Sequence, residues 1–134
     1  MAPARRERIL IVEDDPEVRR LYRAALTVSG FDVIPVSDGF EALYHIDTDL
    51  PDLVVLDLGL PRLSGRDVQR DLASNPRTQH IPILVVTGDP GDLVESANLC
   101  ILRKPVDPER LSAEVERCLR KANGRRRDDT SSTG

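Results

Sequence analysis

The chain is poor in the residues that build most metal, redox and aromatic sites. Its 134 residues include two cysteines, two histidines, one methionine and no tryptophan, and aromatic residues make up only 3%. The hydrophobic core must therefore be mainly aliphatic. Cys100 and Cys118 lie in apolar stretches without metal-ligand spacing, which predicts two buried thiols. His45 and His80 have no ligand neighbours and are interpreted as structural or exposed.

Long hydrophobic runs and an excess of positive charge are also missing. The basic start MAPARRER leads into an apolar run of only four residues, 9–12, too short for a signal peptide or a membrane span. This predicts a cytoplasmic protein with no membrane partner. The net charge of −4 gives no electrostatic basis for direct nucleic-acid binding. With 40% apolar and 31% charged residues, the composition is that of one ordinary globular domain.

Short apolar runs alternate with amphipathic stretches along the chain. The runs are residues 8–12, 31–36, 52–56, 81–86 and 100–102. The first, third and fourth are almost continuously apolar, which is typical of strands covered on both faces. Five strands alternating with five helices predict an α/β fold, a doubly wound parallel sheet with right-handed crossovers.

Capping signals indicate where the intervening helices begin. Asp-Pro at 15–16, 89–90 and 107–108 suits an N-cap followed by the first helical position. Asp38 and Ser64 each begin a sequence that resembles a capping box, opening helices through about Asp47 and Ser74. The first helix is predicted by the spacing of Val18, Leu21, Tyr22, Ala25 and Ser29, with Gly30 as its stop, and the last by Leu111, Val115 and Leu119.

The composition changes after Cys118, where apolar residues give way to KANGRRRDDTSSTG. Such a segment has too little apolar surface to order itself. We therefore expect a folded domain over residues 1–121 and a disordered tail over 122–134.

Polar residues close the predicted strands. They are Glu13, Asp14 and Asp15 after the first strand, Asp57 after the third, Thr87 after the fourth and Lys104 after the fifth. Taken singly, each acidic residue is as well explained by a helix cap, and Asp15 before Pro16 favours that role. Taken together, they lie where ligands bind in doubly wound folds. Two carboxylates roughly 4 Å apart repel by on the order of 4 kcal/mol, so the group needs a cation, and Mg²⁺ suits carboxylate oxygens.

Four segments, ILIVEDDPEVRRL, VVLDLGLPRLSG, ILVVTGD and RKP, resemble in order the signature blocks of response-regulator receiver domains over roughly residues 7 to 121. The resemblance implies a flavodoxin-like, CheY-like (βα)5 fold with strand order 2-1-3-4-5. It assigns the acidic pair to Glu13 and Asp14, the phosphoacceptor to Asp57, the switch hydroxyl to Thr87 and the family lysine to Lys104. It also adds the Gly59 carbonyl to the Mg²⁺ shell and implies a cis Lys104–Pro105 bond.

By this resemblance the protein is a signalling switch of a two-component phosphorelay and not a conventional enzyme. A sensor histidine kinase or a phosphotransfer protein would donate the phosphoryl group, and the domain would catalyse its own phosphorylation and dephosphorylation. A downstream protein target would read the face formed by residues 88–105. The sequence leaves a homodimer open.

Two features depart from the family pattern. Thr87 and Lys104 are only 17 positions apart, so the fourth helix, about residues 90–97, must be short or partly irregular. Ile101 stands where receivers usually have Tyr or Phe. These changes leave open a second hypothesis, a degenerate receiver that acts as a phosphorylation-independent interaction module. An aspartyl-phosphate phosphatase would need a second Asp two residues after the nucleophile, and position 59 is glycine.

Overall fold

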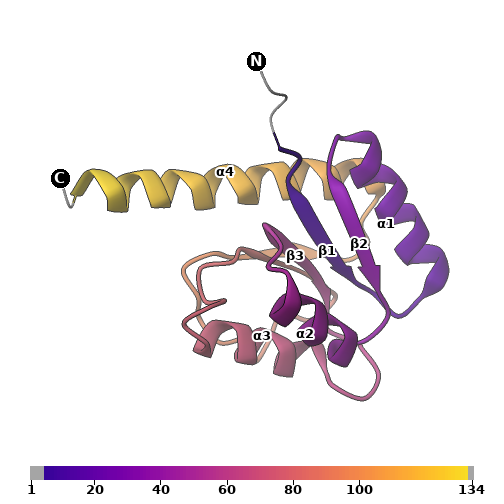
Figure 1. Cartoon of the computed structure of the whole chain (residues 1–134). Helices are drawn as coiled ribbons and strands as arrows, with labels where there is room; N and C mark the ends of the chain where they lie inside the picture. Colours follow the sequence, from indigo (N-terminus) through magenta and orange to yellow (C-terminus); the bar gives the residue numbers. More distant parts are fainter. Residues whose placement is uncertain (1–4, 133–134) are drawn as a thin grey trace.

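The computed structural model describes residues 5–132, with side chains for residues 5–124. Within these residues, five strands form one parallel sheet in the order β2-β1-β3-β4-β5, which confirms the predicted doubly wound α/β architecture. Figure 1 shows β2, β1 and β3 side by side in this order. The strands are β1 (Arg8–Val12), β2 (Asp32–Val36), β3 (Leu53–Asp57), β4 (Ile83–Thr87) and β5 (Leu99–Arg103).

In the part of the chain that the structure describes, four helices connect or follow these strands: α1 (Pro16–Val28), α2 (Gly39–Thr48), α3 (Gly65–Ser74) and α4 (Pro108–Ser132). The predicted capping residues begin all four: Asp107, just before α4, accepts the amide of Arg110 on its side chain at 2.8 Å. The side chain of Asp15 accepts the amide hydrogens of Glu17 and Val18, and Asp38 and Ser64 each accept one amide three residues on. Gly30 follows α1 with a φ of 98°, a left-handed conformation that favours glycine.

Both faces of the sheet are buried, because alternate residues of a strand point in opposite directions. In β1, Ile9 and Ile11 lie in a core cluster with residues of α1 and α4, while Leu10 and Val12 lie in a second cluster with residues of α2 and α3. All four side chains are at most 1% exposed. The continuous apolar run that predicted a doubly covered strand is explained by these two cores.

The predicted fourth helix is absent. Residues 88–98, all of which the structure describes, connect β4 to β5 without a helix, and we call them the connecting segment. Asp89 does not cap a helix: its carboxylate accepts the amide of Gly91. Asp92 then takes a left-handed φ of 65°, which interrupts any helical turn. The expectation of a short helix over residues 90–97 was wrong, although the irregularity predicted there is real.

Side chains of α3 hold the connecting segment in place. Gln69, 1% exposed, donates from Nε2 to the carbonyl of Val94 at 2.8 Å and accepts the Val94 amide on Oε1 at 3.0 Å. Arg66 donates to the carbonyls of Asp89 and Gly91, both at 3.0 Å. These bonds satisfy backbone groups that a helix would otherwise satisfy internally.

The last helix is longer than predicted. Helix α4 packs through Leu111, Val115 and Leu119, as the spacing indicated, and Ala122 is also buried. It continues through residues 122–132, where the composition predicts disorder, and extends past the sheet in Figure 1. The structure differs from the sequence-based expectation at this end, and the domain boundary after residue 121 stays a prediction. Within residues 5–132 no helix is both long and apolar enough to cross a membrane.

The two cysteines are buried as predicted, Cys100 at 6% and Cys118 at 1% exposed. They are not free thiols, however, because their sulfur atoms are bonded to each other. The prediction of two thiols overlooked that β5 and α4 are packed face to face, which places residues 18 positions apart side by side.

Candidate functional site

The carboxyl ends of the strands bring the predicted polar residues to one edge of the sheet. An open cavity of about 720 Å³ lies there, and its lining includes Glu13, Asp14, Asp57, Gly59 and Lys104. It lies where β1 and β3 are neighbours although the chain passes through β2 between them. This is the topological switch point at which doubly wound folds bind ligands.

Three of these residues form an acidic cluster. Glu13, Asp14 and Asp57 each offer one carboxylate oxygen, and these oxygens lie within 4.8 Å of one another. The pKa of Glu13 is raised to about 7, first by burial and then by the hydrogen bond to Asp57 and its negative charge. The Asp15 amide and Lys104 lower that pKa by less. Glu13 is therefore partly protonated near neutral pH.

Asp57 is the most constrained member of the cluster. It is 6% exposed, and its Oδ1 accepts the amide of Gly59 at 3.1 Å and lies 3.4 Å from Nζ of Lys104. Gly65, the first residue of α3, packs directly behind it: a Cβ there would lie 2.4 Å from the Asp57 carbonyl oxygen. The end of β3 is fixed both by its side-chain partners and by the close approach of α3.

The donor set fits Mg²⁺. The cluster offers hard carboxylate oxygens, and Gly59 lines the same cavity. Mg²⁺ prefers oxygen ligands and uses only one or two protein carboxylates, retaining water or phosphate oxygens at its other positions. The pKa of Glu13 is raised by burial first and by Asp57 second, so a bound cation would favour the charged form of this carboxyl. The structure therefore contains an acidic pocket of the kind that suits this ion.

Lys104 contacts Asp57, and Thr87 ends β4, the strand next to β3. Lys104 follows β5 and precedes Pro105 through a cis peptide bond, as the sequence resemblance implied. The hydroxyl of Thr87, at the end of β4, accepts the amide of Asp89 and donates to the carbonyl of Asp89, each at 3.1 Å. Its hydrogen atom is thus directed into the connecting segment. Ile101 points outward from β5 with 42% of its surface exposed.

Sequence reasoning missed the arginines that hold the backbone around this site. Arg19 in α1 donates to the carbonyls of Glu13 and Asp14, at 2.8 and 3.3 Å, and Arg66 binds the connecting segment. Both occupy polar positions of amphipathic helices, where arginine is usually solvated. No local spacing distinguished them, because their partners are backbone carbonyls.

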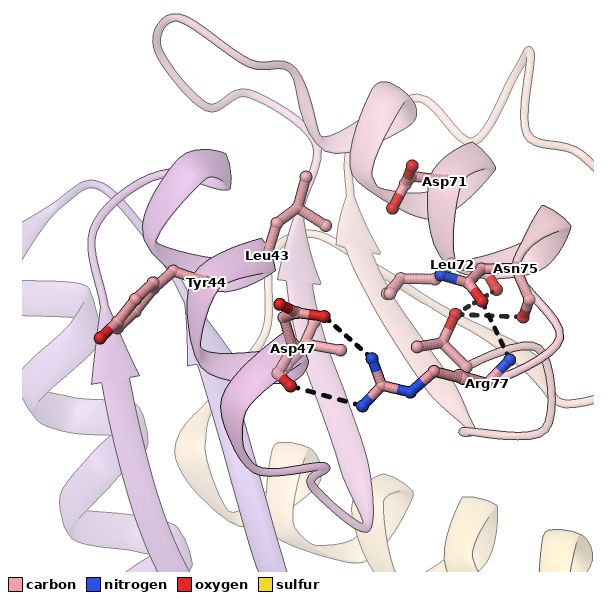
Figure 2. Close-up of a pocket in the computed structure, with 9 residues that line it drawn as sticks. Leu43, Tyr44, Asp47, Asp71, Leu72, Asn75 and Arg77 are labelled. Atoms are coloured by element: carbon pink, nitrogen blue, oxygen red, sulfur yellow. Dashed lines mark hydrogen bonds and ion pairs between the residues drawn. The ribbon is translucent and has the colours of Figure 1, made fainter.

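A second cavity, of about 340 Å³, lies between α2 and α3 and has a different character (Figure 2). Arg77 crosses it to reach Asp47 at 2.9 Å, and Asn75 accepts the Arg77 amide. Thr78 donates to the Leu72 carbonyl. These polar groups bind neighbouring parts of the chain, which indicates a structural role for them.

Comparison with known proteins agrees with this geometry. The family model described as response regulator receiver domain matches residues 9–116. The chain is 36% identical over 123 residues to the alkaline phosphatase synthesis transcriptional regulatory protein PhoP of Bacillus subtilis, covering 87% of this chain and 50% of that protein. It is 37% identical over 118 residues to the response regulator PleD of Caulobacter vibrioides, covering 84% of this chain and 26% of that protein.

Solved structures show the same fold. The chemotaxis response regulator CheY4 of Vibrio cholerae aligns with a TM-score of 0.77 at 24% identity, covering 85% of this chain and 99% of that one. A response regulator structure from Chloroflexus aurantiacus aligns with a TM-score of 0.75 at 31% identity, covering 86% and 98%. The chain spans half or less of the length of the PhoP and PleD relatives.

Proposed function

Because the chain belongs to the response-regulator receiver family, we propose that it is a phosphorylation switch of a two-component phosphorelay, with Asp57 as the phosphoacceptor. A sensor histidine kinase or a phosphotransfer protein would supply the phosphoryl group. The observation that carries the proposal is the position of Asp57: a nearly buried carboxylate at a strand end, beside two further carboxylates and a lysine.

In the proposed phosphoryl transfer, one residue attacks phosphorus and the others neutralise negative charge. Asp57 attacks phosphorus with a carboxylate oxygen, and the bond from phosphorus to the donor nitrogen or oxygen breaks. Lys104, already 3.4 Å from Asp57, neutralises an oxygen of the incoming group. Glu13, Asp14, Asp57 and the Gly59 carbonyl would hold Mg²⁺, which when bound offsets the negative charge of the carboxylates and phosphoryl oxygens. No separate catalytic base is needed, because Asp57 reacts as its anion.

The hydroxyl of Thr87 links the phosphoryl group to the output face. To donate to a phosphoryl oxygen it must leave the carbonyl of Asp89, since it has one hydrogen atom to donate. The same carbonyl is bound by Arg66 of α3, so the change at Asp89 reaches α3 and the rest of the connecting segment. The phosphorylated state is read by a downstream protein through residues 88–105.

This mode of output differs from a rotamer switch at position 101. Ile101 has a branched side chain with restricted torsion and no ring or hydroxyl to present. The connecting segment instead depends on a few side-chain bonds from α3, and such regions open more readily than helices or strands. Its displacement or reordering supplies the two states that a switch requires.

The test is incubation of the purified chain with acetyl phosphate and Mg²⁺, followed by mass spectrometry. We expect one phosphate adduct in the wild type and in Asp71→Ala, which removes an exposed carboxylate of α3 as a matched control. We expect none in Asp57→Ala. An adduct that survives in Asp57→Ala refutes the assignment.

The same measurement distinguishes a phosphorylation switch from a degenerate receiver. A wild-type chain that stays unmodified with both acetyl phosphate and a phosphohistidine donor, while still folded, would support a phosphorylation-independent interaction module. Amide hydrogen exchange with beryllofluoride and Mg²⁺ then tests the output. We expect the largest change in residues 88–98, and unchanged exchange there would refute the proposed route.

A further inference from the structure

We propose that Cys100 and Cys118 form a reversible redox site that fastens α4 to β5, a second covalent input separate from Asp57. The two residues lie 18 positions apart, on β5 and on α4, and their sulfur atoms are bonded. Their Cα atoms are 6.5 Å apart, within the range that a disulfide spans without moving the backbone. Bond formation between these two cysteines does not require Asp57 to be phosphorylated.

The pair is built into a core that accommodates either redox state. Both cysteines belong to the cluster under α1 and α4, together with Leu102, Leu111 and Val115. In the reduced state two thiols would occupy the same places, and a buried thiol behaves as a small apolar side chain. The fold therefore does not depend on the bond, which is the condition for a switch and not for a permanent structural staple.

The position of the bond determines what it controls. It closes a loop that runs from β5 through Lys104 and Pro105 into the first turns of α4. Cross-linking this loop lowers the entropy of every state in which α4 is detached from the sheet. Oxidation thus stabilises the attachment of α4, and reduction leaves it to the apolar contacts of residues such as Leu111 and Val115.

Access to the pair is from the β5 edge of the sheet. β5 is an edge strand, and the connecting segment that precedes it contains no helix. Cys100 is the more exposed of the two, at 6% against 1% for Cys118. Local opening of this edge would expose Cys100 first.

The chemistry requires an oxidant, and a hydroperoxide is the class we propose. The thiolate of Cys100 attacks the peroxide oxygen, the O–O bond breaks, and Cys100 becomes a sulfenic acid as water or an alcohol leaves. The sulfur of Cys118 then attacks the sulfenic sulfur, the S–S bond forms and a second water leaves. Two thiols lose two protons and two electrons, and the peroxide is reduced. A dithiol reverses the step by exchange through a mixed disulfide.

The experiment uses the full chain, treated either with excess dithiothreitol or with hydrogen peroxide. Each sample is then denatured and alkylated with N-ethylmaleimide. We expect two adducts in the reduced sample and none in the oxidised one, with a non-reduced peptide map joining the Cys100 and Cys118 peptides. Dithiothreitol should restore both adducts. Two adducts after peroxide, irreversible sulfinic acid, or cross-linked dimers in place of the internal bond would each overturn the proposal.

Two readouts test the attachment of α4. We expect the oxidised wild type to melt roughly 10 °C above the reduced form, from the entropy of the closed loop. We also expect amide exchange over residues 108–122 to slow by about tenfold or more. In Cys118→Ala neither quantity should respond to peroxide. If that variant does not fold, the two redox states of the wild type still decide the question, and equal exchange in both refutes the role assigned to the bond.

Phosphoryl incorporation at Asp57 is measured in parallel in both redox states. A chain that forms the bond but takes no phosphate would support the redox site and refute the proposed phosphorylation switch. A chain that takes phosphate but never forms the bond would do the reverse. The two proposals therefore fail independently.

Discussion

Replacing Glu13 with glutamine tests whether the acidic cluster destabilises the cation-free protein. Glu13 is 4% exposed, and its pKa of about 7 lies well above the ordinary value of 4.5 because of burial first and of Asp57 second. Glutamine has nearly the same shape and can still form hydrogen bonds through its side-chain amide, but it carries no charge. We expect Glu13→Gln to be more stable than the wild type at pH 8 in EDTA, and no more stable at pH 5.

The direction follows from proton linkage. An acid whose pKa is raised on folding binds its proton more tightly in the folded state, so its contribution to stability is present at low pH and is lost as the pH rises from about 4.5 to about 7. A shift of this size in an enclosed group corresponds to about 3 kcal/mol, from 1.36 kcal/mol per unit. Because the cavity is open to solvent, we expect roughly half of that.

The assay is urea denaturation in EDTA at several values between pH 5 and pH 8. Only the difference between Glu13→Gln and wild type is compared, since other ionisable groups are common to both, and Glu116→Gln on the exposed side of α4 is the matched control. Mg²⁺ should then stabilise the wild type, by about 2.7 kcal/mol at 100 times its Kd, and the variant less. Parallel pH profiles for the two proteins would refute the reasoning.

Three further predictions concern the surroundings of Asp57. Gly65→Ala should lower the free energy of unfolding by about 1–3 kcal/mol, because its Cβ would lie 2.4 Å from a carbonyl oxygen; Gly59→Ala, with its nearest atom at 3.8 Å, should cost much less in the same denaturation assay. Gln69→Leu should lower the free energy of unfolding by about 1–3 kcal/mol, because it removes both hydrogen bonds to Val94. It should also speed amide exchange over residues 88–98, and unchanged exchange there would contradict this prediction. Gly59→Met should slow the loss of phosphate by covering Asp57, and an unchanged phosphate lifetime, followed by mass spectrometry, would show that access at this edge is not limiting.

The sheet and the starts of its four helices could be predicted from sequence because their signals are local. An apolar run such as that of β1 indicates burial on both faces. The caps Asp15, Asp38, Ser64 and Asp107 bind amides within their own first turn. The same signals wrongly predicted a helix in the connecting segment, because Asp89-Pro90 resembles the caps of the other helices. There the outcome was decided by Gln69 and Arg66, more than twenty positions away, and by the backbone of Asp92.

In the candidate site, too, some features could be predicted from the sequence and others depend on contacts between distant residues. The residues that end strands were predictable as neighbours, since parallel strands bring their carboxyl ends to one edge. Their roles in binding and transfer stay predictions. The bond between Cys100 and Cys118 was not foreseen, because pairing depends on the distance between β5 and α4, and sequence spacing does not report it. The backbone contacts of Arg19 were hidden for the same reason.

The paired bonds between Gln69 and Val94 have a consequence for exchanging parts between related domains. A primary amide carries the same donor and acceptor as a peptide group, so Gln69 pairs with Val94 much as a neighbouring strand residue would. A helix transplanted from another receiver between Pro90 and Asn98 would satisfy its own backbone and leave this buried amide without partners. Such a graft should be tolerated only together with an apolar residue at position 69, whereas insertions between Glu95 and Asn98 that leave Val94 in place should be accepted without any second change.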